Sequence, residues 1–543
     1  MAAVLARDRS VTAGRDPDSK LEPDVSTTSV NTIPPLGAAI NEKRFWFQRT
    51  KSYDPDSIAT QPSVFDDPET AAQYQPRPDW ENTHRFDPLA RWTWREENRL
   101  VRKIDFRIMV WTCIMFMALE LDRANIGQAL TDNFLPDLEL STNDYNLGNT
   151  ISRLSFLCAE LPSQLVSKWV GPDRWIPAQI TLWSLVATCQ FWLSGRTSFL
   201  VCRYLLGVLQ GGFIPDVILY LSYFYQHHEL TVRLGFFWTA MSIADICSSL
   251  LAYGILHMRG VQGHSGWRWL FLIEGLLTLV IGIFAFLLMP AGPCQTASWF
   301  RGKDGWFTER EEKIMVNRVL REDPSKSDMH NRQPITLKLL WQSLKDFDLW
   351  PLYILGLTFQ IPMIPPAQYL TLSLRGLGFD TFQTNLLIMP YTVAHMVTML
   401  GVTYLAEYVG ELTFVAMSGQ IWMLPFLIYL NVVDTGELNR WVVYVVTTLL
   451  LSYPNAHPIQ TSVVIASNIY RADDAPLYRR GNRKLLAILC MNIVLYGLVK
   501  AYYVFRNRQR DKQWNAMTAE ERLNYLTTTT DQGNKRLDFR FKH

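Results

Sequence analysis

Charged side chains stand inside two long stretches of this chain that are otherwise apolar. In the first stretch, Glu120 and Arg123 are three residues apart and therefore neighbours on one face of a helix, with Asp122 between them. In the second, Arg153 and Glu160 are seven residues apart and fall on one helical stripe. An arginine fork donates two parallel hydrogen bonds to a carboxylate or a sulfate. The pattern therefore predicts that Arg153 and Arg123 bind an anion.

The carboxylates near these arginines are candidates for carrying a proton. Glu120, Asp122 and Glu160 fit this role, and Asp245 stands alone near the middle of another apolar stretch. At bilayer depth a charged residue costs about 2.5–3.5 kcal/mol, so each of them needs a partner or a wet cavity. Structural roles stay open. Glu120 is an alternative ion-pair partner of Arg123, Glu160 an alternative hydrogen-bond acceptor, and Asp245 an alternative bond between helices.

The apolar stretch RYLLGVLQGGFIPD adds three more candidates. Gln210 is predicted to contact substrate, and Arg203 and Asp216 are predicted gating residues. Gly207 and Gly211 form a small-xxx-small face that favours close approach of another helix. Arg203 is near the end of its stretch, so an alternative is that its side chain reaches back to the membrane surface.

The second half of the chain is poorer in charge. His395 stands alone and is interpreted as a hydrogen-bonded core residue rather than a proton relay. The candidate substrate contacts in this half are Gln360, Asn455 and His457. The asymmetry suggests that the first half binds the anion and the second half selects its shape.

A short basic segment, SKWVGPDRW, separates the second and third apolar stretches. Its charged and glycine residues are predicted to hold an inner gate: Lys168, Gly171, Asp173 and Arg174. The alternative is that the charge only sets the topology of the chain, and the two roles are compatible.

The average composition hides this segregation. The chain has 543 residues, 48% of them hydrophobic and 19% charged, with a mean hydropathy of +0.01. Such values suit a large soluble protein, but charge gathers at the two ends and in one central block. The net charge of +2 excludes a broadly basic nucleic-acid binder.

The apolar stretches have the ~20-residue length needed to cross a bilayer and predict an all-α membrane protein. The first set covers 104–125, 145–166, 175–194, 199–223, 234–257 and 269–289. The second covers 350–372, 382–404, 412–432, 441–457 and 485–505. Loop charge places the acidic loop after the first span outside, and the central block and the basic C-terminal tail inside.

The apolar stretches and the charged segments between them predict five parts of the chain. They are a disordered cytoplasmic tail (1–90), a six-helix bundle with a surface helix (91–290), a cytoplasmic loop (291–348), a second bundle (349–505) and a cytoplasmic C-tail (506–543). Capping boxes predict helices that begin after Thr308 and Thr518.

The sequence lacks the motifs of several other classes of protein. There is no GxxxxGK[ST] phosphate loop, no TVGYG filter, and no nucleophile–base set or metal-ligand spacing. The seven cysteines lie in or beside apolar stretches without a CxxC pair and are interpreted as packing residues. We therefore expect a secondary transporter driven by an ion gradient, not an enzyme, with no cofactor or metal.

A series of longer motifs follows in order: LELDRANIGQA, AELPSQLVSKWVGPDRWIP, RYLLGVLQGGFIPDVILYLSYFY, GWRWLFLIEG, IYRADDAPLYRRGN and GNKRLDFRF. From about residue 45 onward, the chain resembles the fungal allantoate permease family, an anion:cation symporter group of the major facilitator superfamily. The resemblance implies two six-helix bundles around a cavity that opens alternately to each side. It also implies proton-driven uptake of a small anion, such as a ureide, carboxylate vitamin, dipeptide, sulfate or sulfonate, by a monomer in the plasma membrane. The long N-tail and WTWREE resemble the alternative sulfate and sulfonate transporters.

One departure from the family concerns the eleventh span. Relatives continue from SYPNAHPIQ through a further helical stretch before SNIYRADD, whereas here Gln460 is followed by TSVVIA and then SNIY. About one span of ~20 residues is absent, so span eleven is predicted to be truncated. With eleven spans the basic C-tail would lie outside, and with twelve both termini would be cytoplasmic. A gene model that lost an exon segment is favoured over a damaged, inactive transporter.

The leading functional hypothesis is a proton-coupled importer of a small organic anion or sulfur oxyanion. The alternatives are a metabolite/proton antiporter that exports its substrate, a sensor built on a transporter scaffold, and an inactive transporter.

Overall fold

The computed structural model describes residues 54–67, 80–324, 344–409, 412–433, 439–454 and 478–529, together with several shorter stretches. Helices make up the regular structure of these residues, apart from two isolated β-bridges, so the all-α prediction is confirmed. Six helices in the described part are long and apolar enough to cross a membrane. The predicted missing part of span eleven, with Asn455 and His457, lies outside the described residues.

The N-terminal half forms a bundle whose helices match the first six predicted spans. Its helices are α3 (Val110–Ala129), α5 (Thr142–Val170), α6 (Pro172–Cys189), α7 (Arg196–Gln210), α8 (Phe213–Ser222), α9 (His227–Ile255) and α10 (Gly266–Leu288). The Ser141 hydroxyl caps α5, since it accepts from the Asp144 backbone N–H at 3.1 Å while the Asp144 side chain accepts from the Ser141 N–H. The predicted fourth span is therefore two helices, α7 and α8.

Glycines explain both this break and the close packing of α7 on α5. A Cβ at Gly207 would lie 2.0 Å from Ser155 Oγ, and one at Gly211 would lie 2.7 Å from the Phe156 carbonyl oxygen. Gly212 between the helices has φ +86°, a left-handed conformation that strains other residues. The predicted close-approach face of Gly207 and Gly211 thus faces α5.

The C-terminal half contains α13 (Trp350–Thr358), α14 (Ile364–Gln368), α15 (Leu370–Gly376), α16 (Thr381–Leu387), α17 (Met389–Val409), α18 (Leu412–Val432) and α19 (Arg440–Leu451). The prolines of predicted span seven divide it into α13, α14 and α15 because proline cannot donate the helical hydrogen bond. Neighbouring helices satisfy the carbonyls left at the break. Gln420 Nε2 donates to the Phe359 carbonyl at 2.9 Å, and Asn492 Nδ2 donates to the Thr358 carbonyl at 3.0 Å.

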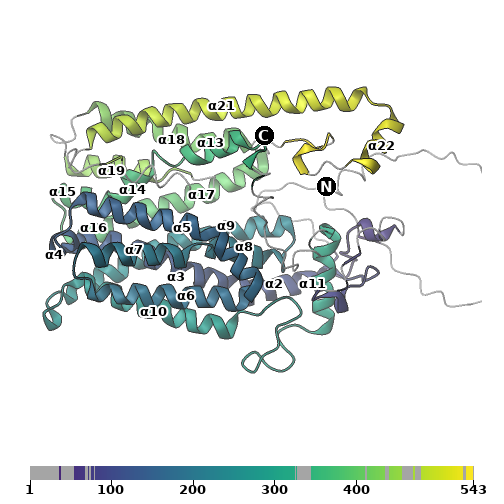
Figure 1. Ribbon diagram of the computed structural model, residues 1–543, viewed down its shortest axis with the longest axis horizontal. Coiled ribbons are helices and arrows are strands. Elements are labelled where there is room, and N and C mark those ends of the chain that lie inside the picture. Colours follow the sequence, from purple (N-terminus) through teal and green to yellow (C-terminus); the bar gives the residue numbers. More distant parts are fainter. Residues whose placement is uncertain are drawn as a thin grey trace, which may run out of the picture.

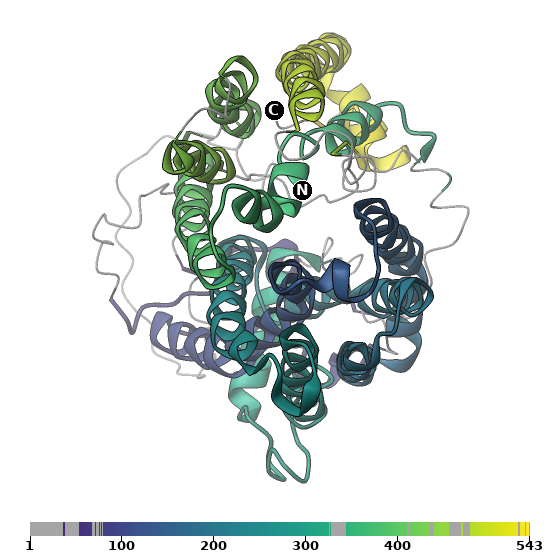
Figure 2. The same cartoon turned by 90° about the vertical axis from the view of Figure 1, so that its left-hand side faces the viewer.

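The two halves lie side by side, the N-terminal half in blue and teal and the C-terminal half in green and yellow (Figures 1 and 2). We call the end of the molecule with α4 (Phe134–Asp137) and α15 the outer end, and the end with α2 (Trp94–Ile104) and α11 (Glu309–Glu322) the inner end, following the loop-charge prediction. The halves meet at the outer end. There His257 stacks on Phe382 with ring centroids 3.8 Å apart, and Thr381 Oγ1 donates to the Thr131 carbonyl at 3.0 Å.

Tyrosines extend this outer contact. The Tyr369 hydroxyl donates to Asn146 Oδ1, and Asn146 Nδ2 donates to the Tyr470 carbonyl at 3.2 Å. Tyr145, beside Asn146 on α5, meets the edge of the Tyr369 ring at a centroid distance of 6.2 Å. Side chains of both halves therefore close the outer end above the interior of the molecule.

At the inner end, α2, α11 and part of the N-terminal tail form an ion-paired assembly. Arg318 on α11 has no exposed surface and donates to Glu229 Oε2 at 2.5 Å, while Glu97 on α2 lies 3.5 Å from it. Arg321 donates to Asp66 of the tail at 2.5 Å. The composition predicts a disordered tail up to residue 90, but residues 54–67 and 80–90 pack here. A polar, proline-rich segment can adopt an ordered conformation when a charged helix forms hydrogen bonds and ion pairs with it.

The C-terminal helix α21 (Arg479–Ala516) is longer than the predicted last span, 485–505. The basic segment RNRQRDK continues the helix because arginine, glutamine and lysine are good helix formers and no proline interrupts it. α19 begins near Phe379, whose ring lies 5.1 Å from Trp441, and both α19 and α21 begin at the outer end. α21 then runs to the inner end, where α22 (Ala519–Thr528) follows. α21 thus carries the basic segment RNRQRDK to the side of α2 and α11.

Candidate functional site

Three arginines from three helices line one small cavity inside the N-terminal half. Arg123 comes from α3, Arg153 from α5 and Arg203 from α7, and the cavity holds about 30 Å³. The other lining residues are Asp122, Ser152, Phe156, Leu206, Gly207 and Gln210. The close approach of α7 to α5 at Gly207 brings Arg203 of α7 close to Arg153 of α5, and Arg123 joins them from α3.

Arg123 is the most highly connected of the three. Its Nη1 donates to Glu120 Oε1 at 2.8 Å, and its Nε donates to Gln210 Oε1 at 3.3 Å. Its guanidinium carbon lies 5.0 Å from the centre of the Phe156 ring, which is cation–π range. The ion pair of Glu120 with Arg123, which is the alternative to a proton-carrying role for Glu120, is present, and its Arg123 lines the cavity.

Arg203 and Arg153 have no carboxylate partner among the described residues. Arg203 is 8% exposed; its Nη2 donates to Asn149 Oδ1 at 3.1 Å, and its buried Nε has no hydrogen bond there. The alternative that Arg203 reaches the membrane surface is therefore wrong, because α5 and α7 enclose its side chain. Arg153 experiences repulsion from both Arg123 and Arg203. Two guanidinium groups thus line the cavity without an ion-pair partner among the described residues, although the charge of Glu120 attracts Arg153 and Asp122 lines the same cavity.

Asp245 lies between this cavity and the C-terminal half. On α9 it is close enough to Glu120 and to Tyr391 of α17 for electrostatic interaction with both. α9 packs against α16 and α17, so this carboxylate stands where the two halves meet. A change in its charge would therefore act on that contact.

The predicted gate residues gather elsewhere, at the inner end. Lys168, Gly171, Asp173, Arg174 and Asp216 all line an open pocket of about 550 Å³. Arg203, predicted to belong with them, lies instead in the arginine cavity.

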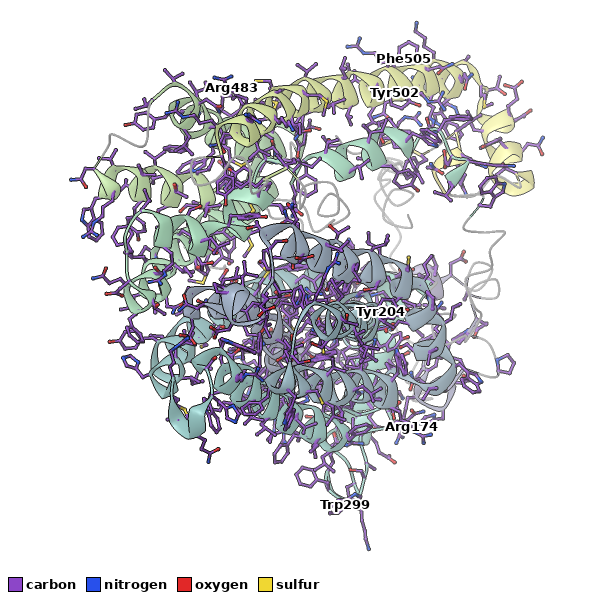
Figure 3. The ribbon with its side chains drawn as sticks, turned by 60° about the vertical axis from the view of Figure 1, so that its left-hand side comes forward. Arg174, Tyr204, Trp299, Arg483, Tyr502 and Phe505 are labelled. Atoms are coloured by element: carbon purple, nitrogen blue, oxygen red, sulfur yellow. The ribbon has the colours of Figure 1, made fainter. Side chains whose placement is uncertain are left out.

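Contacts within this inner pocket tie α5 to α8. Ser163 Oγ donates to Asp216 Oδ2 at 3.3 Å, and Glu160 lies close enough to Asp216 to repel it. Glu160 thus stands beside the inner pocket rather than among the residues of the arginine cavity. Arg174 is exposed and lies at the edge of the N-terminal half, and Trp299 lies at the tip of the loop after α10 (Figure 3).

The C-terminal half contributes neutral polar groups. Gln360 is 8% exposed at the break between α13 and α14. His395 Nδ1 is 2.8 Å from the Tyr453 carbonyl oxygen, so its interpretation as a hydrogen-bonded core residue is confirmed.

Sequence reasoning missed one buried carboxylate. Glu274 on α10 has no exposed surface, and Ser248 Oγ on α9 donates to its Oε1 at 3.4 Å. Its signal was available, since it is the acidic residue of the otherwise apolar run LFLIEGLLTLV. The same rule that selected Asp245, a charge inside a span, selects Glu274.

The sequence profile of the Major Facilitator Superfamily matches residues 112–497. The chain belongs to this superfamily. It is therefore a multi-pass membrane transporter and not an enzyme, as predicted.

Relatives with recorded names support this placement. An uncharacterized transporter of Saccharomyces cerevisiae is 44% identical over 521 residues, covering 90% of this chain and 95% of the relative. An uncharacterized transporter of Schizosaccharomyces pombe is 26% identical over 448 residues, covering 77% and 85%. An Agrobacterium vitis protein named "Putative tartrate transporter" is 33% identical over 221 residues, covering 40% and 47%. Among solved structures, the Escherichia coli xylose transporter XylE in a partially occluded inward-open conformation has a TM-score of 0.49 at 12% identity, covering 73% and 95%.

The alignment with the Saccharomyces relative is longer than the part of this chain that it covers. It runs over 521 positions, whereas 90% of a 543-residue chain is fewer than 500 residues. The relative therefore has positions that this chain lacks.

Proposed function

We propose that the protein is a proton-coupled importer of a small anion and a member of the allantoate permease family within its superfamily. The observation that carries this proposal is the convergence of Arg123, Arg153 and Arg203 on one buried cavity. Burying guanidinium groups away from water is costly unless an opposite charge meets them. A bound anion would supply that charge.

The charge balance favours an anion with more than one oxygen acceptor. Arg123 already has Glu120, so Arg153 and Arg203 remain to receive the substrate. Carboxylates and sulfur oxyanions accept parallel bonds from such forks. The name of the Agrobacterium vitis relative refers to a dicarboxylate, which has this chemistry. The substrate class is therefore a small carboxylate, ureide, sulfate or sulfonate.

Alternating access would act through the contacts between the halves. Outer contacts such as Thr381 with Thr131 would break when the outer end opens, and the pocket with Lys168 and Asp216 would close at the inner end. The arginine cavity holds only about 30 Å³ here, so the substrate enters when the halves move apart. Glu120, Asp122 and Asp245 are placed to carry the coupled proton. We place the protein in the plasma membrane with its inner end in the cytoplasm.

A substrate screen tests the proposal directly. The chain would be expressed in yeast lacking anion uptake, and growth would be scored on a panel of ureides, carboxylates, sulfate and sulfonates. Labelled uptake that falls when a protonophore is added supports proton-coupled import. Efflux that lowers the internal substrate would instead identify an exporter and overturn the proposed direction.

Arg153→Ala tests the site within this assay. Uptake should be abolished while surface expression persists, because the cavity loses an unpaired guanidinium. Arg508→Ala is the matched control, since Arg508 lies exposed on α21 and removes the same charge far from the cavity. Unchanged uptake by Arg153→Ala would overturn the anion site.

The positions that the Saccharomyces relative has and this chain lacks, together with the predicted truncation of span eleven, favour a second possibility, a transporter damaged at that span. Sequencing of the transcript across the codons for Gln460 and Ser462 distinguishes the cases. A longer transcript would support an exon lost from the gene model. A transcript that encodes the present sequence, together with uptake only after the stretch is restored, would support the damaged transporter.

A further inference from the structure

Behind the arginine cavity, the N-terminal bundle buries a second carboxylate beside Asp122. Glu274 has no exposed surface, and of its two oxygens only Oε1 has a hydrogen bond among the described residues, from Ser248. Oε2 is buried and unpaired there. A carboxylate in this position interacts with little that would stabilise its negative charge.

Asp122 approaches the same place from α3. It is 1% exposed and lies against Thr278 and Trp183, yet neither of its oxygens has a partner in hydrogen-bond geometry among the described residues. Thr278 is one helical turn beyond Glu274 on α10, so both residues present to the same face of that helix. The negative charges of Asp122 and Glu274 repel each other. Asp122 also lines the arginine cavity.

Among the described residues, the elements packed around α10 bring no positively charged side chain to Glu274, although Asp122 lines the cavity with the three arginines. α6 contributes Trp183 and also Thr188, which lies against Gly275. α9 contributes Ser248. Asp245, also on α9, interacts with Glu120 instead. On η7 (Leu256–Met258), His257 stacks on Phe382 at the outer end. Arg268 of α10 donates to the Phe191 and Leu193 carbonyls, and η6 (Gln190–Trp192) carries no charge. Arg123 faces Glu120 and Gln210 instead.

Asp122 and Glu274 are buried, repel each other and have no ion-pair partner among the described residues. Mutual repulsion and burial disfavour the state in which both carboxylates are charged. We propose that Asp122 and Glu274 share the coupled proton, with Glu274 as its buried holding site and Asp122 as the group that exchanges it with the arginine cavity. The step is a proton transfer from one carboxylate oxygen to another. It breaks one O–H bond and forms one, and no electrons are transferred. The proposal rests on the proposed proton-driven import and names the residue pair that performs it.

The pair also links the proton to the anion. When Asp122 carries the proton, it adds no negative charge to the cavity, and Arg153 and Arg203 attract the anion fully. When the proton leaves, the charge of Asp122 repels the anion. Release of one therefore favours release of the other, as symport requires.

Glu274→Gln separates this role from a structural one. The glutamine carbonyl can still accept from Ser248 Oγ, but the side chain cannot release a proton. Counterflow exchange of labelled substrate, which needs no net proton movement, should stay within about twofold of the unsubstituted protein. Gradient-driven accumulation should fall by about tenfold or more, and its dependence on external pH should flatten. Glu274→Asp should retain coupling.

Ser248→Ala is the matched structural control, because it removes the hydrogen bond and keeps the carboxylate. Retained coupling in Ser248→Ala with lost coupling in Glu274→Gln supports the proposal. Full accumulation and an unchanged pH profile in Glu274→Gln would overturn it. Equal loss of counterflow in both variants would also overturn it, because that result assigns Glu274 to the α9–α10 contact alone.

A measurement on the purified full-length protein keeps this test independent of transport. Infrared spectra at neutral pH should show a protonated carboxyl band that shifts in deuterated water and disappears in Glu274→Gln or Asp122→Asn. If the unsubstituted protein shows the band but no anion uptake, the proposed function fails and the proton pair stands. If uptake is proton-driven but neither variant changes the band, the pair fails and the proposed function stands.

Discussion

The two halves of the molecule are built on the same helical scaffold but differ in what they bury. The N-terminal half encloses arginines and carboxylates, with Arg203 and Glu274 among its buried residues. The buried polar residues of the C-terminal bundle, such as His395, Gln420 and Asn492, are neutral amides and a histidine bonded to backbone carbonyls. In the N-terminal half, we propose that buried charge binds the substrate and carries the proton. In the C-terminal half, buried amides satisfy the carbonyl groups of a helix that prolines interrupt.

At the inner end, by contrast, the two halves are alike. Arg318 joins α11 to α2 and α9 in the N-terminal half without any exposed surface. In the C-terminal half, Asp348 precedes α13 and accepts from Arg506 Nε at 2.9 Å and from Arg510 Nη2 at 3.0 Å, both on α21. Tyr502 also donates to it, while the neighbouring Phe505 points outward from α21 (Figure 3). Each half therefore holds its own inner end with buried charge.

The largest effect we expect is on stability at the inner end of the N-terminal half. Arg318→Ala should lower the free energy of unfolding by about 3–5 kcal/mol, because Glu229 and Glu97 would stay buried without their partner. Thermal unfolding in detergent measures it. Arg95→Ala is the control, since Arg95 pairs with Asp56 at an exposed site and should change little. A wild-type melting temperature for Arg318→Ala would contradict the buried network.

The next effect concerns the arginine cavity. Arg203→Ala should lower kcat/KM for uptake by about a hundredfold, or ~2.7 kcal/mol, because a buried fork is lost from the anion site. Arg203→Lys should recover part of this, since the charge returns without the fork geometry. Initial rates of labelled uptake, normalised to surface protein, measure both. Equal uptake by Arg203→Ala and Arg508→Ala would remove Arg203 from the site.

A smaller effect tests the supporting role of the C-terminal amides. Gln420→Ala and Asn492→Ala should each lower the free energy of unfolding by about 1–3 kcal/mol, because buried carbonyls at the end of α13 lose their donors. The KM for substrate should stay within about twofold. Asn431→Ala is the control, since its amide donates to Leu427 within the same helix. A KM increase as large as that of Arg203→Ala would break the division between the halves.

The smallest effect is a pH dependence at the inner end of the C-terminal half. Burial by itself would raise the pKa of Asp348, but hydrogen bonds from Arg506 and Tyr502 and the charges of Arg506 and Arg510 outweigh it and lower that pKa. A lowered pKa means that Asp348 stabilises the fold at neutral pH and loses this effect as acid protonates it, below about pH 4. The difference in melting temperature between the unsubstituted protein and Asp348→Asn should shrink as pH falls through that range. A constant difference would show that the charge of Asp348 contributes nothing.

Local patterns in the sequence predicted most helices well. Hydrophobic length located the spans, and the capping boxes at Thr308 and Thr518 begin α11 and α22 as expected. The prolines after Thr358 account for the break in span seven. These features depend on neighbours in the chain, so one sequence suffices to find them. The order of residues 54–67 and 80–90 was not predicted because it depends on Arg321 and other residues of α11, more than two hundred positions away.

The candidate site was predicted residue by residue but not as an arrangement. Helical spacing paired Glu120 with Arg123 and selected Arg153, since both arguments lie within one helix. Helical spacing could not predict that Arg203 lines the same cavity or that Glu160 lies beside the inner pocket. Those placements depend on how α3, α5, α7 and α8 pack.

The sequence by itself determined that this chain crosses a membrane, belongs to a two-half transporter class and carries unusual charge in its first half. Hydropathy, charge bias and motif order are properties of the amino-acid sequence and do not depend on how the helices pack. Only the tertiary structure decided which charges meet. The glycine contact of α7 with α5 and the packing of α3 beside them place three guanidinium groups in one cavity. The packing of α3 on α10 brings Asp122 toward Glu274. Electrostatic energy depends on distance and burial, and both are set by helix packing rather than by position in the chain.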